Sequence, residues 1–234
     1  MQPYFFPYFG YFSLIASVDR WIVFDIVNYK KRSWMNRNRI LCERKGWQYI
    51  SYPVKDATLG TKIFEVCGNK PEKARQSIVG QLGIYKKKAP FVQQAIDIVN
   101  ETFALGESGR LVDINVSGLQ AVSERLGFDI EFEVLSRMDL DLPEIEHAGQ
   151  WALAISSVLG AETYINPVGG REIFSPEEFS EAGIELAFSD PEPLVYDVTP
   201  FSFEPGLSIL DALCWLPADE VSDRIKDGAR VFSA

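Results

Sequence analysis

The chain begins with an aromatic segment that contains two prolines and leads into a short apolar run, and this limits the fold most strongly. Residues 1–12 read MQPYFFPYFGYF, and the prolines within them prevent a continuous helix. Residues 21–24 (WIVF) are uninterruptedly apolar, which is typical of a strand covered on both faces. Such a strand needs helices on either side of it, so the sequence predicts an α/β fold.

Hydrophobic periodicity extends this prediction along the chain. We expect a mainly parallel sheet flanked by helices, with a helix-rich middle and C-terminal part. Helices are predicted over residues 11–18, 71–104 (two helices separated at 86–90), 110–126, 147–159, from Ser208 and from residue 217 onward. Further strands are predicted over residues 47–54, 128–135, 163–165 and 184–188.

Length and charge limit the organisation. A chain of 234 residues with 47% hydrophobic residues can bury a full core, and we expect one domain over residues 1–234 with a soft boundary near residues 106–110. Residues 1–117 carry 17 basic and 10 acidic residues (net +7), whereas residues 118–234 carry 6 and 23 (net −17). Anions should therefore bind to the first half, and extended duplex nucleic acid should be repelled by the second.

A dense cationic segment points to the ligand. Residues 30–45 hold seven of the 23 Lys and Arg residues and one acid, Glu43. The segment is predicted to be a loop, and either it is a solvated surface or it binds an anion. In the second reading Lys31, Arg32, Arg37 and Arg39 hold phosphate, Trp34 stacks on a ring, and Asn36 and Asn38 recognise hydroxyl groups.

The aromatic opening has two readings of its own. It can be a hydrophobic plug over the sheet end, or Tyr8 and Tyr11 can form a stacking wall, with Gly10 letting a ligand approach the helix start. The order of elements also suggests an adenylyl transferase with a HIGH-type motif, but Gly10-Tyr11 stands where such an enzyme needs Gly-His.

Two groups are candidate proton acceptors. Asp25 follows the first apolar strand, at the strand end where α/β proteins place ligands. His147 is the only histidine, and the alternative is that it is an ordinary exposed residue. The three cysteines are widely spaced, so neither a disulfide framework nor a metal site is predicted.

A glycine loop offers a second anion-binding motif. Asn166, Gly169, Gly170 and Arg171 follow a predicted strand. They can form a plain turn, or they can present amide donors and a positive charge to an anion.

Localisation is inferred from what the sequence lacks. It shows no apolar run long enough for a membrane helix and no signal-peptide pattern, which favours a cytoplasmic protein. The abrupt start suggests that a short strand precedes Met1.

Three stretches resemble the WbqC-like proteins of bacteria, in the right order and over nearly the whole chain. They are residues 2–41 (QPYFFPYFGYFSLIASVDRWIVFD followed by NYKKRSWMNRNRIL), residues 159–188 (beginning LGAETYINPVGGREIF) and residues 203–211 (FEPGLSILD). The resemblance implies an association with surface polysaccharides of the O-antigen type and a sugar-modifying transferase activity. Ile26 stands where the family pattern has a second acid, which weakens a metal or base role for this strand end.

These inferences combine into one leading hypothesis: a transferase that modifies a nucleotide-linked or phosphate-bearing amino sugar by acyl or aminoacyl transfer. The expected partner is a phosphate-bearing small molecule, either a nucleotide sugar or an acyl donor; a tRNA has no specific support. The alternatives are a non-catalytic carbohydrate- or nucleotide-binding module and an adenylyl-transfer enzyme. The sequence specifies neither a cofactor nor an oligomeric state.

Overall fold

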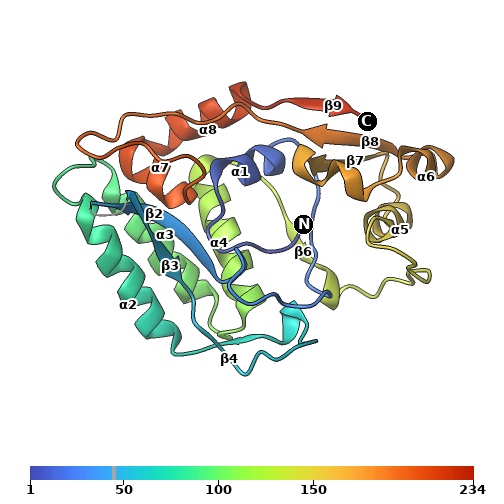
Figure 1. Ribbon diagram of the computed structural model, residues 1–234, viewed down its shortest axis with the longest axis horizontal. Helices are drawn as coiled ribbons and strands as arrows, with labels where there is room; N and C mark the ends of the chain where they lie inside the picture. The colour runs from blue at the N-terminus through green and yellow to red at the C-terminus, as the bar shows by residue number, and fades with distance from the viewer. Residues whose placement is uncertain (44–45) are drawn as a thin grey trace.

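Helices and short strands alternate along the chain in a computed structural model that describes residues 1–43 and 46–234 (Figure 1). The helices are α1 (Phe9–Ile15), α2 (Pro71–Leu82), α3 (Val92–Leu105), α4 (Leu111–Leu126), α5 (Gln150–Val158), α6 (Pro176–Glu181), α7 (Ile209–Trp215) and α8 (Ala218–Asp227). Turns of 3-10 helix are η1 (Ile63–Glu65), η2 (Gly83–Tyr85), η3 (Leu135–Arg137) and η4 (Val168–Ile173). The strands are β1 (Trp21–Val23), β2 (Arg37–Cys42), β3 (Gly46–Ser51), β4 (Val54–Lys55), β5 (Cys67–Gly68), β6 (Phe132–Val134), β7 (Thr163–Pro167), β8 (Glu185–Ser189) and β9 (Val231–Ser233).

The strands form several small sheets. β1 pairs in parallel with β6, and β7 pairs in parallel with β8, which also carries β9 as an antiparallel neighbour. β2 and β3 form an antiparallel hairpin, and β4 pairs with β5 in the same sense. The predicted α/β class is confirmed, but parallel pairing is confined to small sheets.

Helices α2, α3, α4, α7 and α8 contribute buried residues to the main core. α3 and α4 pack side by side, with Val99 and Leu111 fully buried in the same hydrophobic cluster (Figure 1). α4 ends where the sequence predicted, because Gly127 adopts the left-handed conformation (φ 70°) that a helix terminus favours. The expected soft boundary near residues 106–110 falls in the turn between these two packed helices.

The aromatic opening lies inside the main core. Phe5, Phe6 and Phe12 are almost completely buried, and the Phe6 backbone has a positive φ of 40°, which is unusual for a bulky residue. Buried carbonyls need donors, and side chains from distant elements supply them. Asn38 donates to the Phe5 and Phe6 carbonyls, and Ser208 donates to the Phe6 carbonyl as well. The hydrophobic plug, one of the two alternatives predicted for this segment, therefore describes Phe5, Phe6 and Phe12.

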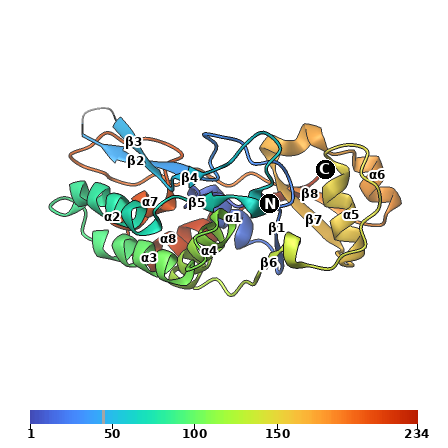
Figure 2. The ribbon, with the colours of Figure 1, turned by 90° about the horizontal axis from the view of Figure 1, so that it is seen from below.

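A second, smaller hydrophobic cluster lies at one end of the molecule. Figure 2 shows α5, α6, β7 and β8 gathered there, away from the β2–β3 hairpin. Its buried members are Phe179, Ile184, Leu186 and Phe188. α6 was not predicted; its N-cap is Ser175, whose hydroxyl accepts from the Glu178 amide. Across residues 1–43 and 46–234, no helix combines the length and apolar character needed to cross a membrane.

Candidate functional site

The cationic segment expected to be a loop becomes a strand from Arg37 onward, so that part of the prediction is wrong. β2 pairs with β3 in a register that places Arg37 opposite Ser51 and Arg39 opposite Tyr49. Side chains alternate across a strand, so both arginines lie on one face while Asn38 points into the core. The predicted basic cluster also included Arg44 and Lys45, which lie outside the described residues.

Arg39 lies over two indole rings. Its guanidinium carbon lies 5.5 Å from the ring centroid of Trp34 and 5.1 Å from that of Trp47. Its Nη2 donates to the carbonyls of Pro205 and Gly206 at 3.4 and 3.2 Å. Stacking and hydrogen bonding fix the plane of the guanidinium, so that its other N–H groups point in defined directions.

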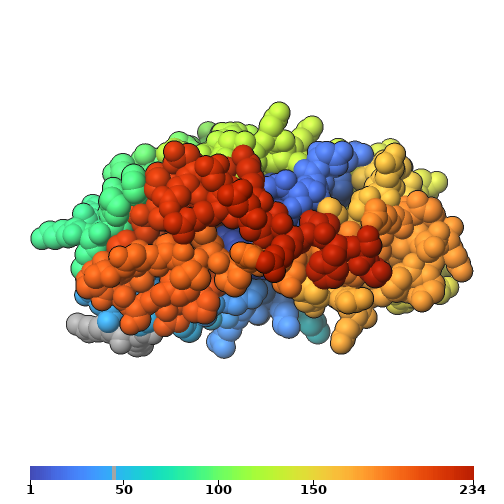
Figure 3. Space-filling model, turned by 90° about the horizontal axis from the view of Figure 1, so that it is seen from above, coloured from blue at the N-terminus to red at the C-terminus, as the bar shows by residue number. Residues whose placement is uncertain are grey.

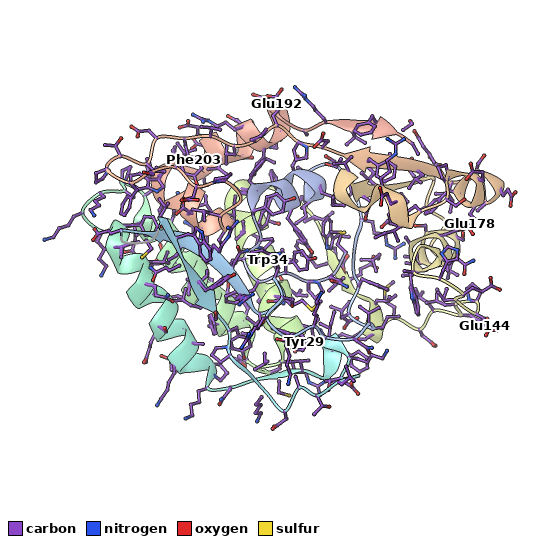
Figure 4. The ribbon with its side chains drawn as sticks, in the orientation of Figure 1. Tyr29, Trp34, Glu144, Glu178, Glu192 and Phe203 are labelled. Carbon is purple, nitrogen blue, oxygen red and sulfur yellow. The ribbon has the colours of Figure 1, made fainter. Side chains whose placement is uncertain are left out.

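Arg37 is held in a similar way. Its guanidinium carbon lies 4.2 Å from the ring centroid of Tyr49, whose ring also contacts that of Trp47 edge-on. The charge of Arg37 also acts on the buried Tyr29. Burial raises the pKa of Tyr29, and the positive charge of Arg37 partly opposes that rise. Figure 4 shows Trp34 near the middle of the molecule and Tyr29 below it.

A shallow hollow adjoins the hairpin on the side of α2. It has a volume of about 360 Å³, and its lining includes Tyr49, Lys70 and Lys73. The hollow and the two stacked arginines together form a larger basic surface, which we call the cationic face. The cationic face consists of Trp34, Arg37, Arg39, Trp47, Tyr49, Lys70 and Lys73.

The positive charges of this surface are not neutralised by acids. Within residues 1–43 and 46–234, ion pairs involve other basic side chains, and Arg37, Arg39, Lys70 and Lys73 take part in none. The Nε atoms of Arg37 and Arg39 are buried and have no acceptor. Buried donors without acceptors are uncommon, and a phosphate oxygen is a suitable acceptor for a guanidinium.

Some residues predicted to bind ligand instead support the fold. Asn38 is buried, and its amide is used by the Phe5 and Phe6 carbonyls, so it cannot recognise a hydroxyl group in this conformation. Asn36 donates to the Tyr52 carbonyl at 3.2 Å, and its own side-chain oxygen is buried without a partner. Lys31 and Arg32 are exposed in the turn before the hairpin.

The two tyrosines of the predicted stacking wall lie in different environments, one buried and one exposed. Tyr11 is 3% exposed, and its hydroxyl donates to the Gln2 carbonyl at 2.7 Å, so its ring belongs to the core. Tyr8 remains 38% exposed, and its ring packs where a Gly10 side chain would lie. Gly10 thus makes room for Tyr8. The buried position of Tyr11 also weakens the adenylyl-transfer alternative, which needs a catalytic side chain at this place.

The two candidate proton acceptors do not meet at the hairpin. Asp25 is fully buried, and its carboxylate oxygens accept from the Ser136 amide at 2.9 Å and from the Ser136 hydroxyl at 2.6 Å. His147 lies near Glu178, with 3.1 Å between His147 Nε2 and a Glu178 oxygen. Figure 4 shows Glu178 at the end of the molecule away from Trp34.

The glycine motif lies in the small cluster, away from the hairpin (Figure 2). Asn166 is the residue before the last in β7 and accepts from the Tyr164 hydroxyl at 3.1 Å, while Gly170 lets the backbone approach the Asn166 amide. Gly169 and Arg171 belong to η4, and the Arg171 guanidinium carbon lies 5.6 Å from the ring centroid of Phe188. The structure therefore does not join this motif to the cationic face.

Sequence reasoning missed Trp47, Tyr49, Lys70 and Lys73. The alternating residues WQYIS predicted a strand but did not reveal its partner. Pairing that strand with residues 37–42 would have placed the two rings beside the two arginines, because directly opposed residues share a face.

Comparisons with known proteins agree on the relationships of the chain. The sequence model of the WbqC-like protein family matches residues 2–223. A protein of Mycobacterium tuberculosis, named Uncharacterized protein Rv1507c, is 28% identical over 215 residues, which make up 91% of this chain and 90% of that protein. No solved structure matches the chain. Since the family match covers almost the full length, the chain belongs to the WbqC-like protein family.

Proposed function

We propose that the protein is a transferase that modifies a nucleotide-linked or phosphate-bearing sugar, with the phosphate held on the cationic face. Arg37 and Arg39 bind phosphate oxygens, and Trp34, 41% exposed, offers a ring for stacking. The family resemblance suggests that the modified sugar enters a surface polysaccharide.

One observation carries the proposal: two guanidinium groups are stacked on aromatic rings while their buried Nε atoms lack acceptors. A buried donor without an acceptor costs about 1 to 3 kcal/mol, and a ligand phosphate removes this cost on binding. Stacking also orders the arginine side chains beforehand, which reduces the entropy lost when the ligand binds.

Calorimetry tests the binding step. We expect uridine diphosphate N-acetylglucosamine or uridine diphosphate to bind to the native protein, and the double variant Arg37→Gln with Arg39→Gln to abolish binding. Arg125→Gln is the control, since it removes one partly exposed arginine that pairs with Glu101 away from the cationic face. Equal affinity in the native protein and the double variant would sink the assignment.

A second candidate function, a non-catalytic module that binds the same ligand, is favoured by the placement of the candidate bases. Asp25 already binds Ser136 through both carboxylate oxygens, and His147 lies away from the cationic face. A product assay separates the two functions. Loss of product formation in Asp25→Asn or His147→Ala, with ligand binding and the melting temperature retained, supports the transferase; ligand binding with no turnover supports the module.

A further inference from the structure

An open cleft of about 740 Å³ lies on another part of the surface, where α7 and α8 meet the segment that precedes them. Figure 3 shows this segment, in orange, lying against α7 and α8, in red. The lining residues are Lys88, Pro90, Val195, Tyr196, Asp197, Thr199, Trp215, Leu216 and Arg224. The cleft has the size of a small-molecule site. Its lining shares no residue with the cationic face.

An aromatic wall contains an unused hydrogen-bond donor. Trp215 is 8% exposed, lines the cleft, and packs against the rings of Tyr85 and Phe201. Its indole N–H is buried and has no acceptor. A buried indole N–H ordinarily finds a partner, so this donor has an unused hydrogen-bonding capacity.

Positive charges come from two separate parts of the chain that line the cleft. Lys88 Nζ lies 4.5 Å from the ring centroid of Phe201 and pairs with Glu43, while Arg224 donates to the Val195 carbonyl at 3.0 Å and pairs with Glu220. Both cations are thus positioned by neighbouring groups.

The acidic residue of the cleft is occupied within its own loop. Asp197 Oδ1 accepts from the Thr199 amide at 2.9 Å and from the Thr199 hydroxyl at 2.6 Å. The cleft therefore holds two fixed cations, each paired with an exposed acid outside the lining, and one acid that is hydrogen-bonded within its own loop. Exposed ion pairs contribute little, so the anionic group of a ligand can replace Glu43 and Glu220 as the partner of these cations.

A buried polar network fixes the inner wall. The Tyr196 hydroxyl donates to Asp211 Oδ2 at 2.6 Å, and the Tyr85 hydroxyl and the Leu41 amide donate to Asp211 Oδ1. Asp211 is completely buried. Because these bonds join three distant segments, the Tyr196 ring is held in place before any ligand binds.

We propose that this cleft is a second ligand site, which binds a small sugar bearing a phosphate or carboxylate group. The anionic group lies between Lys88 and Arg224, the Trp215 indole donates to a ligand oxygen, and the aromatic wall contacts the apolar face of the ring. The site does not depend on the function proposed for the cationic face.

Tryptophan indole signals in two-dimensional NMR test the proposal on the intact protein. The chain has five tryptophans, and the variant Trp215→Phe identifies one indole N–H signal by its loss. We expect glucose 1-phosphate or glucuronic acid to shift the Trp215 signal, because the indole gains an acceptor. Neutral glucose and inorganic phosphate should each have much weaker effects. The Trp34 and Trp47 signals report separately on the cationic face.

Charge variants complete the test. Lys88→Gln combined with Arg224→Gln should weaken binding measured at Trp215 about tenfold or more. Lys87→Gln, an exposed neighbour outside the lining, should leave affinity unchanged. A Trp215 signal that does not move with either anionic sugar overturns the site, and an equal response to glucose or inorganic phosphate overturns its ligand class. Arg39→Gln should leave these Trp215 shifts intact, so failure at one site is distinguishable from failure at the other.

Discussion

The side-chain amide of Asn38 donates to the carbonyl of Phe6 at 2.8 Å. This bond connects the strand that carries the two stacked arginines to the only part of the aromatic opening with a positive φ. Strand β2 therefore presents Arg37 and Arg39 on its outer face. On its inner face, Asn38 stabilises the unusual backbone conformation of Phe6.

Asn38→Ala should destabilise the protein more than any exposed substitution in the hairpin. It removes donors from the Phe5 and Phe6 carbonyls and leaves buried acceptors short of partners, which predicts a loss of about 2 to 4 kcal/mol. Chemical denaturation measures this loss. Asn36→Ala, which removes one bond to the Tyr52 carbonyl, should cost clearly less, and equal costs would contradict the role given to Asn38.

Arg39→Lys should weaken ligand binding although it keeps the charge. A lysine ammonium is not planar, so it cannot stack on the Trp34 and Trp47 rings while donating to the Pro205 and Gly206 carbonyls. We expect a fall in affinity of about tenfold, or ~1.4 kcal/mol, by calorimetry with uridine diphosphate. Arg230→Lys, at an exposed ion pair, is the control, and an Arg39→Lys variant that binds normally would argue for a purely electrostatic surface.

Two glycine substitutions should have opposite effects. A side chain at Gly68 would collide with the hydroxyl of buried Tyr52, which donates to the Gly109 carbonyl at 2.8 Å. Gly68→Ala should therefore cost about 1 to 3 kcal/mol through overpacking. Gly80 lies in α2 with open space beside it, and Gly80→Ala should add about 0.5 to 1 kcal/mol by raising helix propensity. Thermal unfolding that shifts in the same direction for both variants would refute this distinction.

Asp211 should make stability depend on pH in an unusual direction. Burial raises the pKa of its carboxyl above the ordinary value of 3.8, although hydrogen bonds from Tyr196, Tyr85 and the Leu41 amide oppose that rise. The unfolded state therefore loses this proton at a lower pH than the folded state. The stability that the group contributes is complete below pH 3.8 and is lost as pH rises through the folded pKa.

Asp211→Asn isolates this effect because the amide does not ionise. Denaturant unfolding between mildly acidic and neutral pH should show the native protein losing stability relative to the variant as pH rises. A stability difference that is constant across this range, or that changes in the opposite direction, would contradict the raised pKa.

Local signals explain which elements the sequence could predict. The apolar residues 21–24 and the left-handed Gly127 each act within a few residues, and the strand and the helix end expected from them are present. Ser208 was expected to cap a helix, and its hydroxyl accepts from the Leu210 amide at 3.3 Å. The α/β class followed from the same signals.

Long-range pairing explains what the sequence could not predict. The basic residues before β3 suggested a loop, because nothing local shows that Asn38 turns inward to reach Phe5 and Phe6. The cationic face then depends on the register between β2 and β3. The cleft collects residues from Lys88 to Arg224, a separation that no sequence window covers.

The hydrogen bond from Ser208 to the Phe6 carbonyl spans 202 residues, which affects how the protein matures on the ribosome. Residues 6 and 7 emerge early in translation, but the Ser208 hydroxyl and the Ile209 amide, which donate to their carbonyls, are added near the end. Until then the aromatic opening, rich in Phe and Tyr, has no complete set of partners and offers a binding segment for chaperones. The native fold should therefore form only after α7 has been synthesised, and not progressively from the N-terminus. Ribosome-bound chains that end before α7 should remain sensitive to protease.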